Sequence, residues 1–205
     1  MGYLQAIIDG VIPEDKISKY LNIIYSETER LNKMSNTILD LSKNKLNGTK
    51  LKYSNFNINE LLESVAASLK VKAFDKKISI DFENISNPVI VCADYEKIQR
   101  VVYNLLDNAI KFTTKGTVRW GYQEKENGQI RFYVTDTGCG IPNDKKEVIF
   151  ERFVKLDSFT QGLGLGLSLC KIIIERMHGT IGVESEVGEG STFWFTIPNL
   201  SDNHI

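Results

Sequence analysis

A long amphipathic stripe near the start of the chain constrains the fold more than any other feature of the sequence. Its apolar side chains recur at the three- and four-residue spacing of one helix face. They are Ile17, Leu21, Ile24, Leu31, Ile38 and Leu41. The pattern predicts a helix over 14–46 of about eight turns. Because a narrow stripe on so long a helix is typical of helices that pack against partner helices, we expect a bundle between two chains.

Length and composition indicate one compact domain with a helical appendage. The chain has 205 residues, of which 42% are hydrophobic and 25% are charged, close to the average for soluble globular proteins. No apolar run approaches the roughly 20 residues of a membrane span. The first residues also lack the basic and apolar segments of a signal peptide. We therefore expect this part of the protein to be cytoplasmic, with any membrane anchor of the parent protein upstream.

Charge and cysteine content argue against several other classes of function. A net charge of −1, with lysines spread along the sequence, gives no field that would favour nucleic acid. The cysteines Cys92, Cys139 and Cys170 are far apart and lack CxxC spacing. This spacing argues against a disulfide framework and a zinc site, so we expect reduced thiols. His178 and His204 are the only histidines.

The boundary between the long helix and the compact domain is predicted at the Asn47-Gly48-Thr49 turn. We expect a linker over 48–56, a domain over 57–200 and a tail over 201–205. The periodicities predict helices at 57–73, 95–112 and 163–177, and strands at 78–83, 89–92, 117–125, 129–135, 180–184 and 191–197. Hairpin-linked strands favour an α+β fold, a two-layer sandwich with helices on one face of a mixed, mostly antiparallel sheet.

Three polar residues form a row on the predicted helix 95–112. Asn104, Asn108 and Lys111 fall within one sector of about 60° beside an apolar face. Taken alone, such a row is more often a solvated helix edge than a binding site. The two motifs that follow it favour a site.

The first of these motifs is Asp136-Thr137-Gly138-Cys139-Gly140-Ile141, which follows a predicted strand. Its carboxylate precedes glycines that allow the backbone to turn tightly against a ligand. The carboxylate can accept a hydrogen bond from an exocyclic amino group such as that of adenine. The alternative explanation of this motif alone is a turn at the end of a strand.

The second motif is the glycine-rich run 161–167, which leads into an apolar helix. Its alternating glycines leave backbone N–H groups free to face a phosphate at the helix N-terminus, although a glycine repeat alone also suits a flexible hinge. Between the two motifs, Phe150-Glu151-Arg152-Phe153-Val154-Lys155 forms an aromatic and basic segment that could fold over a ligand.

Together these segments resemble the conserved boxes of sensor histidine kinases, in the family's order. Residues 104–113 resemble the N box, 136–141 the first glycine box, 150–153 the F box and 162–166 the second glycine box. Gly188-Glu189-Gly190-Ser191-Thr192-Phe193 resembles the closing strand motif, so the similarity spans about 57–198. Glu27 to Leu31 resembles the second helix of the family's dimerisation hairpin, which implies that 1–47 is the C-terminal part of that hairpin.

The resemblance implies a Bergerat-type ATP-binding fold with a Mg-ATP pocket. In it Asp136 would hold the adenine amino group, Asn108 would ligate Mg²⁺, and Asn104 and Lys111 would contact the phosphates. Gly164 and Gly166 would donate backbone N–H groups to the phosphates, and Thr192 would place a hydroxyl near the adenine. The other residues expected to line the pocket are Phe112, Gly138, Gly140, Ile141, Phe153, Gly162, Leu163, Leu165 and Leu167.

The residue four positions before Asn108 bears on the type of reaction. Related ATPases of the same fold carry a glutamate there that activates water, whereas this chain has Asn104, whose amide has no useful basicity. Hydrolysis is therefore disfavoured. Asp107 projects about 100° away from the polar row, so we expect it to be solvent-facing or structural.

A histidine kinase needs a neutral imidazole to attack the γ-phosphate. In the family that histidine precedes a segment that Tyr3 to Gly10 resembles, and His178 matches a position without an acceptor role. We therefore expect that this chain binds Mg-ATP without phosphorylating itself. The resemblance implies that the intact kinase phosphorylates its histidine, passes the phosphoryl group to the receiver domain of a response regulator, and dimerises through 14–46.

Three alternatives stay open at this stage. One is a nucleotide-binding signalling module, or pseudokinase, another is an ATPase of the same superfamily, and the third is a serine kinase of the anti-sigma type. The segment between Phe153 and Gly162 is short and resembles the lid of hybrid kinases. The presence of the expected pocket residues and of the long helix favours the histidine kinase.

Overall fold

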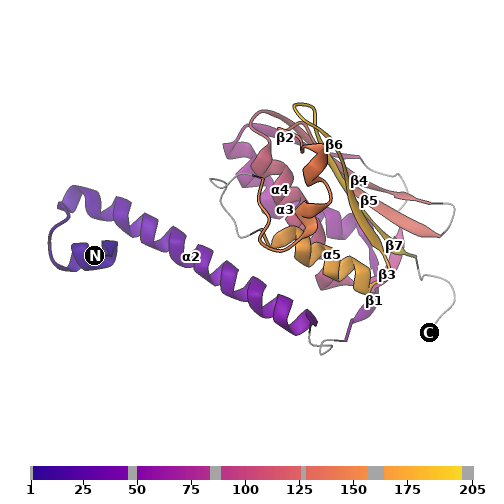
Figure 1. Ribbon diagram of the computed structural model, residues 1–205, viewed down its shortest axis with the longest axis horizontal. Coiled ribbons are helices and arrows are strands. Elements are labelled where there is room, and N and C mark those ends of the chain that lie inside the picture. Colours follow the sequence, from indigo (N-terminus) through magenta and orange to yellow (C-terminus); the bar gives the residue numbers. More distant parts are fainter. Residues whose placement is uncertain (1, 46–49, 84–88, 126–127, 157–163, 200–205) are drawn as a thin grey trace. The chain divides into compact units, whose positions relative to one another are not determined.

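The computed structural model describes residues 2–45, 50–83, 89–125, 128–156 and 164–199 (Figure 1). The chain divides into two compact units, Met1–Thr49 and Lys50–Ile205.

The first unit is a helical hairpin. A short helix, α1 (Tyr3–Ile8), precedes the 32-residue helix α2 (Glu14–Lys45). Gly10, with a φ of 65°, lies in the turn between them, and the rings of Tyr3 and Tyr20 pack 5.4 Å apart. The predicted helix over 14–46 is thus present over Glu14–Lys45, and residue 46 lies outside the described residues. No helix in the described ranges is long and apolar enough to cross a membrane.

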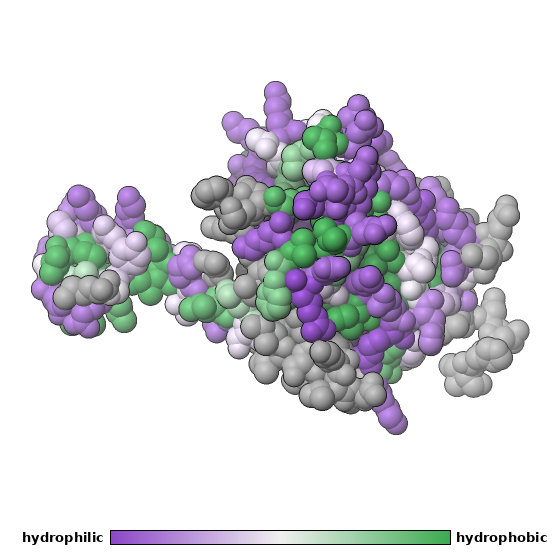
Figure 2. Space-filling model, in the orientation of Figure 1, coloured by the Kyte–Doolittle hydropathy of each residue, from purple (hydrophilic) through white to green (hydrophobic). Residues whose placement is uncertain are grey.

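Large apolar side chains remain exposed on this unit, where Figure 2 shows hydrophobic surface beside hydrophilic surface. They are Tyr3, Leu4, Ile8, Val11, Leu21, Tyr25 and Leu31. Side chains on a stripe like this normally lose contact with water in a folded assembly. The hairpin therefore presents an apolar face that suits a further helix.

The second unit is built on a five-stranded sheet with the strand order β2-β4-β5-β7-β6. These strands are β2 (Ile78–Glu83), β4 (Gly116–Glu124), β5 (Gln129–Asp136), β6 (Thr180–Glu186) and β7 (Gly190–Pro198). The β2 and β4 strands pair in parallel and the other neighbours are antiparallel. A separate two-stranded sheet joins β1 (Tyr53–Asn57) to β3 (Ile90–Asp94).

Three helices cover one face of the large sheet (Figure 1). They are α3 (Ile58–Asp75), α4 (Tyr95–Phe112) and α5 (Gly166–Arg176). This two-layer arrangement confirms the predicted α+β sandwich with a mixed, mostly antiparallel sheet.

Local sequence explains where the helices begin and how the layers pack. The side chain of Asn57 accepts a hydrogen bond from the Asn59 N–H at the start of α3, and Asp94 accepts one from Lys97 at the start of α4. On β5 every second residue is buried, so one face of the strand packs against the helices. In this core the Phe132 and Phe195 rings stack 4.6 Å apart.

Two differences from the prediction are larger than a shift of one or two residues. The expected linker at 48–56 overlaps β1, whose polar, largely exposed sequence does not show the pattern of a buried strand. Strand β1 forms because it pairs with the distant β3, a contact that local sequence does not specify. Helix α5 begins at Gly166 rather than at residue 163, and Gly164 before it has a φ of 69°, which a helix does not allow.

Candidate functional site

The glycine turn after β5 lies against the C-terminal end of α4. A Cβ atom at Gly138 would lie 2.7 Å from the carbonyl oxygen of Phe112, so only glycine permits this approach. The same helix carries Asn104, Asn108 and Lys111, all half-buried beside its apolar face. Two of the predicted motifs are therefore in contact.

Asp136 is a buried carboxylate that accepts hydrogen bonds from backbone N–H groups. It is 4% exposed, and its Oδ1 accepts a hydrogen bond of 2.8 Å from the Gly138 N–H. Burial raises the pKa of Asp136, while hydrogen bonds from the backbone of Gly138 and Ser191 lower it. The carboxylate is thus held in one position, and it suits an N–H donor from a ligand.

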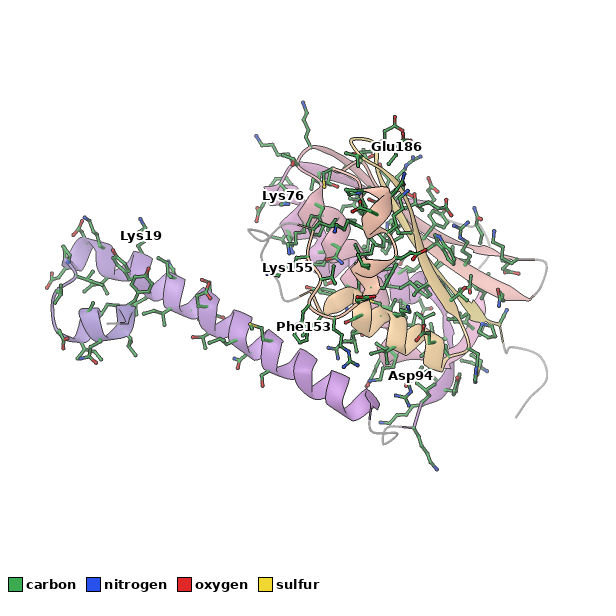
Figure 3. The ribbon with its side chains drawn as sticks, in the orientation of Figure 1. Lys19, Lys76, Asp94, Phe153, Lys155 and Glu186 are labelled. Carbon is green, nitrogen blue, oxygen red and sulfur yellow. The ribbon has the colours of Figure 1, made fainter. Side chains whose placement is uncertain are left out.

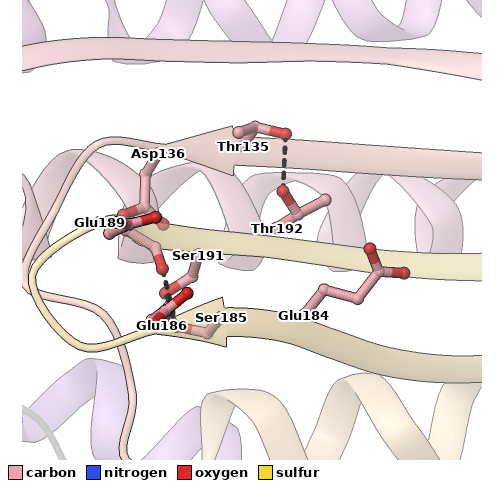
Figure 4. Close-up of a pocket in the computed structure, with 9 residues that line it drawn as sticks. Thr135, Asp136, Glu184, Ser185, Glu186, Glu189, Ser191 and Thr192 are labelled. Carbon is pink, nitrogen blue, oxygen red and sulfur yellow. Dashed lines mark hydrogen bonds between the residues drawn. The ribbon is translucent and has the colours of Figure 1, made fainter.

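Thr192, which is expected to place its hydroxyl near the adenine, lies on the face of the sheet opposite to that of Asp136. It pairs with Thr135 across the ladder, and the two hydroxyl oxygens are 3.0 Å apart (Figure 4). Ser191 pairs with Asp136 and is buried with it. Because side chains alternate along a strand, a shift of one residue changes the face, and Ser191 rather than Thr192 shares a face with Asp136.

The segment resembling the F box contacts the second glycine motif. The Phe153 N–H donates to the carbonyl oxygen of Gly164 at 2.9 Å, and a Cβ atom at Gly164 would lie 2.4 Å from the carbonyl oxygen of Val154. Both Phe153 and Gly164 have positive φ angles. The Phe153 ring itself is two-thirds exposed (Figure 3), so it does not close over the site in this conformation.

The start of α5 lies beside α4. A Cβ atom at Gly166 would be 3.8 Å from Oδ1 of Asn104, and Asn104 also hydrogen-bonds the buried thiol of Cys170. No side chain caps the N-terminus of α5, so its first N–H groups suit an anion. Leu165 is buried and Leu167 is half-buried. Gly162 and Leu163 lie outside the described residues.

Lysines gather at the C-terminal end of α4. Burial lowers the pKa of Lys111, Asp107 raises it, and the nearby charges of Lys72, Lys155 and Lys76 lower it further. Such a group of cations favours a polyanionic ligand such as a triphosphate.

Neighbouring contacts stabilise this end of α4. The Lys76 ammonium donates to the carbonyl oxygens of Ile110 and Lys111, in the last turn. Asp107 forms an ion pair with Lys72 on α3, in agreement with the structural role expected for it.

An open depression lies at the strand ends beside Asp136, with no lining residue from α4 or α5 (Figure 4). Its lining residues are Thr135, Asp136, Glu184, Ser185, Glu186, Glu189, Gly190, Ser191 and Thr192. Figure 3 shows Glu186 at this end of the unit and Asp94, the N-cap of α4, at the opposite end. The depression therefore shares Asp136 and Ser191 with the candidate site and receives no contribution from the polar row of α4.

The donor set suits a metal that binds few protein ligands. Within the described residues, no group of three or more His, Cys, Asp or Glu side chains could hold a metal ion. Mg²⁺ keeps most of its water shell and is commonly bound through one or two protein oxygens together with phosphates. The half-buried amide of Asn108 fits that mode of binding.

Comparison with known proteins gives the family. Residues 93–201 match the family model described as histidine kinase-, DNA gyrase B- and HSP90-like ATPase. The chain belongs to this family. Together with the relatives below, the match identifies the second unit as the catalytic ATP-binding domain of a sensor histidine kinase.

Among curated relatives, the sensor protein SrrB of Staphylococcus aureus is 34% identical over 203 residues, which cover 96% of this chain and 34% of SrrB. The chain thus spans about a third of the length of this relative. Full-length ShkA in complex with AMPPNP superposes with a TM-score of 0.82 at 29% identity, covering 96% of this chain and 42% of that chain. The histidine kinase ThkA in complex with the response regulator protein TrrA gives 0.79 at 30% identity, covering 99% and 57%.

The residues that sequence reasoning missed in the catalytic domain are Ser185, Ser191 and Cys170. Counting alternate residues back from the buried Phe193 would have found Ser191. The contacts of Ser185 and Cys170 join segments far apart in the sequence, and no local signal indicates them.

Proposed function

We propose that this catalytic domain binds Mg-ATP and supplies the γ-phosphate for phosphorylation of a histidine in the complete kinase. The observation that supports it most is the contact of both glycine motifs with α4. Gly138 lies against Phe112, and Gly166 lies against Asn104. A base held at Asp136 would thus have its phosphates near Asn108 and the start of α5.

Each residue has a proposed role at the nucleotide. Asp136 accepts a hydrogen bond from the adenine amino group, with Ser191 beside it in place of Thr192. Asn108 ligates Mg²⁺, and the ion would neutralise part of the negative charge of the phosphates. Asn104 and Lys111 contact the phosphates, together with the backbone N–H groups of Gly164 and Gly166. The residues proposed to line the remainder of the site are Phe112, Gly138, Gly140, Ile141, Phe153, Gly162, Leu163, Leu165 and Leu167.

The protein residues position and polarise the nucleotide rather than react with it. In phosphoryl transfer the charge on the equatorial oxygens must be stabilised while nucleophile and leaving group stay in line. Lys111 and the N-terminus of α5 provide that charge. Asn104, with no basic side-chain group, does not activate water, which favours transfer to an imidazole over hydrolysis.

We further propose that this polypeptide does not phosphorylate itself. His178 lies just after α5 with a φ of 60° and contributes its backbone N–H to the helix end, which is a structural role. His204 lies outside the described residues. The complete kinase would pass the phosphoryl group to an aspartate of a receiver domain, and the complex of ThkA with a response regulator supports that class of partner.

The apolar face of the first unit supports a homodimer formed through α2. Leu21 and Leu31 are about half exposed or more, at 47% and 61%. Association of two such faces would remove these side chains from water. Burial of apolar surface stabilises the dimer by about 25 cal/mol for each Å².

Incubation with γ-labelled ATP tests the proposed reaction. The chain is expected to retain radiolabelled nucleotide at equilibrium but to carry no acid-labile label after denaturation. Acid-labile label on this chain would contradict the proposal about self-phosphorylation. Rapid release of inorganic phosphate in the same samples would instead favour an ATPase. If a complete kinase binds ATP but transfers no phosphoryl group, a signalling module is favoured.

A further inference from the structure

The hydroxyl of Ser185, near the end of β6, connects three segments of the catalytic domain. It donates to the carbonyl oxygen of Gly190 at 2.7 Å and accepts from the backbone N–H of Ile141 at 2.8 Å. It also lies 3.0 Å from the hydroxyl of Ser191. One small side chain thus links β6, β7 and the glycine turn that follows Asp136. Figure 4 shows its contact with Ser191.

The turn between β6 and β7 supports the glycine turn closely. A Cβ atom at Gly140 would lie 1.9 Å from the carbonyl oxygen of Glu186, and the Gly188 N–H donates to the carbonyl oxygen of Cys139 at 2.9 Å. The glycine turn therefore rests on the hairpin tip, with Ser185 as the side chain that joins the two.

Loss of this hydroxyl would leave a buried backbone donor without its partner. Ile141 is 5% exposed, so its N–H has little access to water. An unsatisfied buried donor is costly, and the chain would shift to satisfy it. Because Ser191 pairs with Asp136, such a shift would move the turn relative to the carboxylate.

The position of Asp136 decides which purine it accepts. Adenine presents an amino group that donates to a carboxylate, whereas guanine presents a carbonyl oxygen at the equivalent position, which the carboxylate repels. This discrimination depends on geometry. A displaced carboxylate forms a weaker hydrogen bond with the adenine amino group and also repels the guanine carbonyl oxygen less strongly.

We propose that Ser185 is a positioning residue that sets the selectivity of the site for adenine over guanine nucleotides. It acts through the Ile141 backbone and Ser191, which it fixes relative to Asp136. This inference rests on the proposed function of Asp136 as the group that binds adenine.

Nucleotide titrations of four proteins test the proposal. With Ser185→Ala, the affinity for Mg-ATP should fall about tenfold, and the ratio of ATP affinity to GTP affinity should decrease. Ser185→Thr keeps the hydroxyl and should restore both quantities. The matched control is Thr196→Val, which removes the hydroxyl pair between Thr180 and Thr196 (2.8 Å) on the same hairpin. It should lower the melting temperature without changing the ATP to GTP ratio.

The outcomes separate this inference from the proposed function. If the unsubstituted chain binds neither nucleotide, the proposed function fails. If it binds ATP and Ser185→Ala changes only the melting temperature, Ser185 is merely structural and the inference is overturned. If Ser185→Ala does not fold, Ser185→Cys, which keeps the volume and weakens the hydrogen bonds, takes its place. Unchanged selectivity in that variant would overturn the inference equally.

Discussion

Ser191 lies opposite Asp136 in the ladder between β7 and β5, whereas its neighbour Thr192 lies opposite Thr135 on the other face of the sheet. We predict that Ser191→Ala lowers Mg-ATP affinity by about three- to tenfold, the equivalent of one hydrogen bond. Thr192→Val should leave the affinity unchanged. Calorimetric titration of both variants checks this, and a larger loss in Thr192→Val would mean that the register assignment of the site is wrong.

Substitution of Asp136 by Asn should separate stability from nucleotide binding. Burial raises the pKa of Asp136 from its ordinary value of 3.8, so the ionised carboxylate destabilises the folded chain at neutral pH. The neutral amide has no such penalty. We expect Asp136→Asn to melt at a higher temperature than the unsubstituted chain at pH 7 and to lose Mg-ATP binding.

The pH dependence of this stabilisation follows from the sign of the shift. As the pH falls through the raised pKa, the carboxyl group of Asp136 becomes neutral in the folded chain. The difference in melting temperature between the Asp136→Asn variant and the unsubstituted chain should therefore shrink, and it should disappear below the ordinary pKa of 3.8. Thermal melts of both proteins between about pH 3 and 8 measure this difference. A stabilisation that grows as the pH falls would contradict the assigned sign.

The three cysteines should differ sharply in reactivity towards a thiol reagent. Cys139 is exposed, Cys92 is half-buried and Cys170 is buried. Burial raises the pKa of Cys170 to about 12, so almost no thiolate is present at pH 8. In the native chain Cys139 should be modified first and Cys170 only after unfolding, as followed by peptide mass spectrometry. Early modification of Cys170 would contradict its burial on α5 against Asn104 of α4.

Substitution of Asp107 tests whether this acidic residue on α4, rather than the neighbouring Asn108, contacts the nucleotide. It pairs with Lys72, and the two side chains are 28% and 45% exposed. Removing a partly exposed pair costs about 0.2–1 kcal/mol of unfolding free energy, so Asp107→Asn should change stability slightly. Affinity for Mg-ATP should stay as it is. A loss of binding comparable to that caused by substitution of Asp136 would give Asp107 a role that its ion pair does not suggest.

Periodic elements were predictable from the sequence, whereas contacts between distant segments were not. The helix α4 and the strand β2 occupy the predicted ranges, because alternation and capping are local signals. The strand β1 escaped prediction because its partner β3 supplies the pairing. Local glycine patterns indicated the two motifs that contact α4, but not which helix they would contact.

The face on which Thr192 lies has a simple physical origin. A motif match gives the order of residues, but the face of the sheet is decided by the pairing of β7 with β5. Ser185 was missed for a related reason, since its hydroxyl joins the glycine turn to β7 only in three dimensions.

Calorimetric titration of Mg-ATP into the chain and its Asn108→Ala variant tests the central claim most directly. We predict one exothermic binding event per chain that depends on Mg²⁺ and is lost in the variant. The melting temperature of the nucleotide-free variant should stay close to that of the unsubstituted chain. Absence of binding by the unsubstituted chain, or equal affinity in the variant, would contradict the claim that Asp136, Asn108 and the second glycine motif serve one magnesium nucleotide.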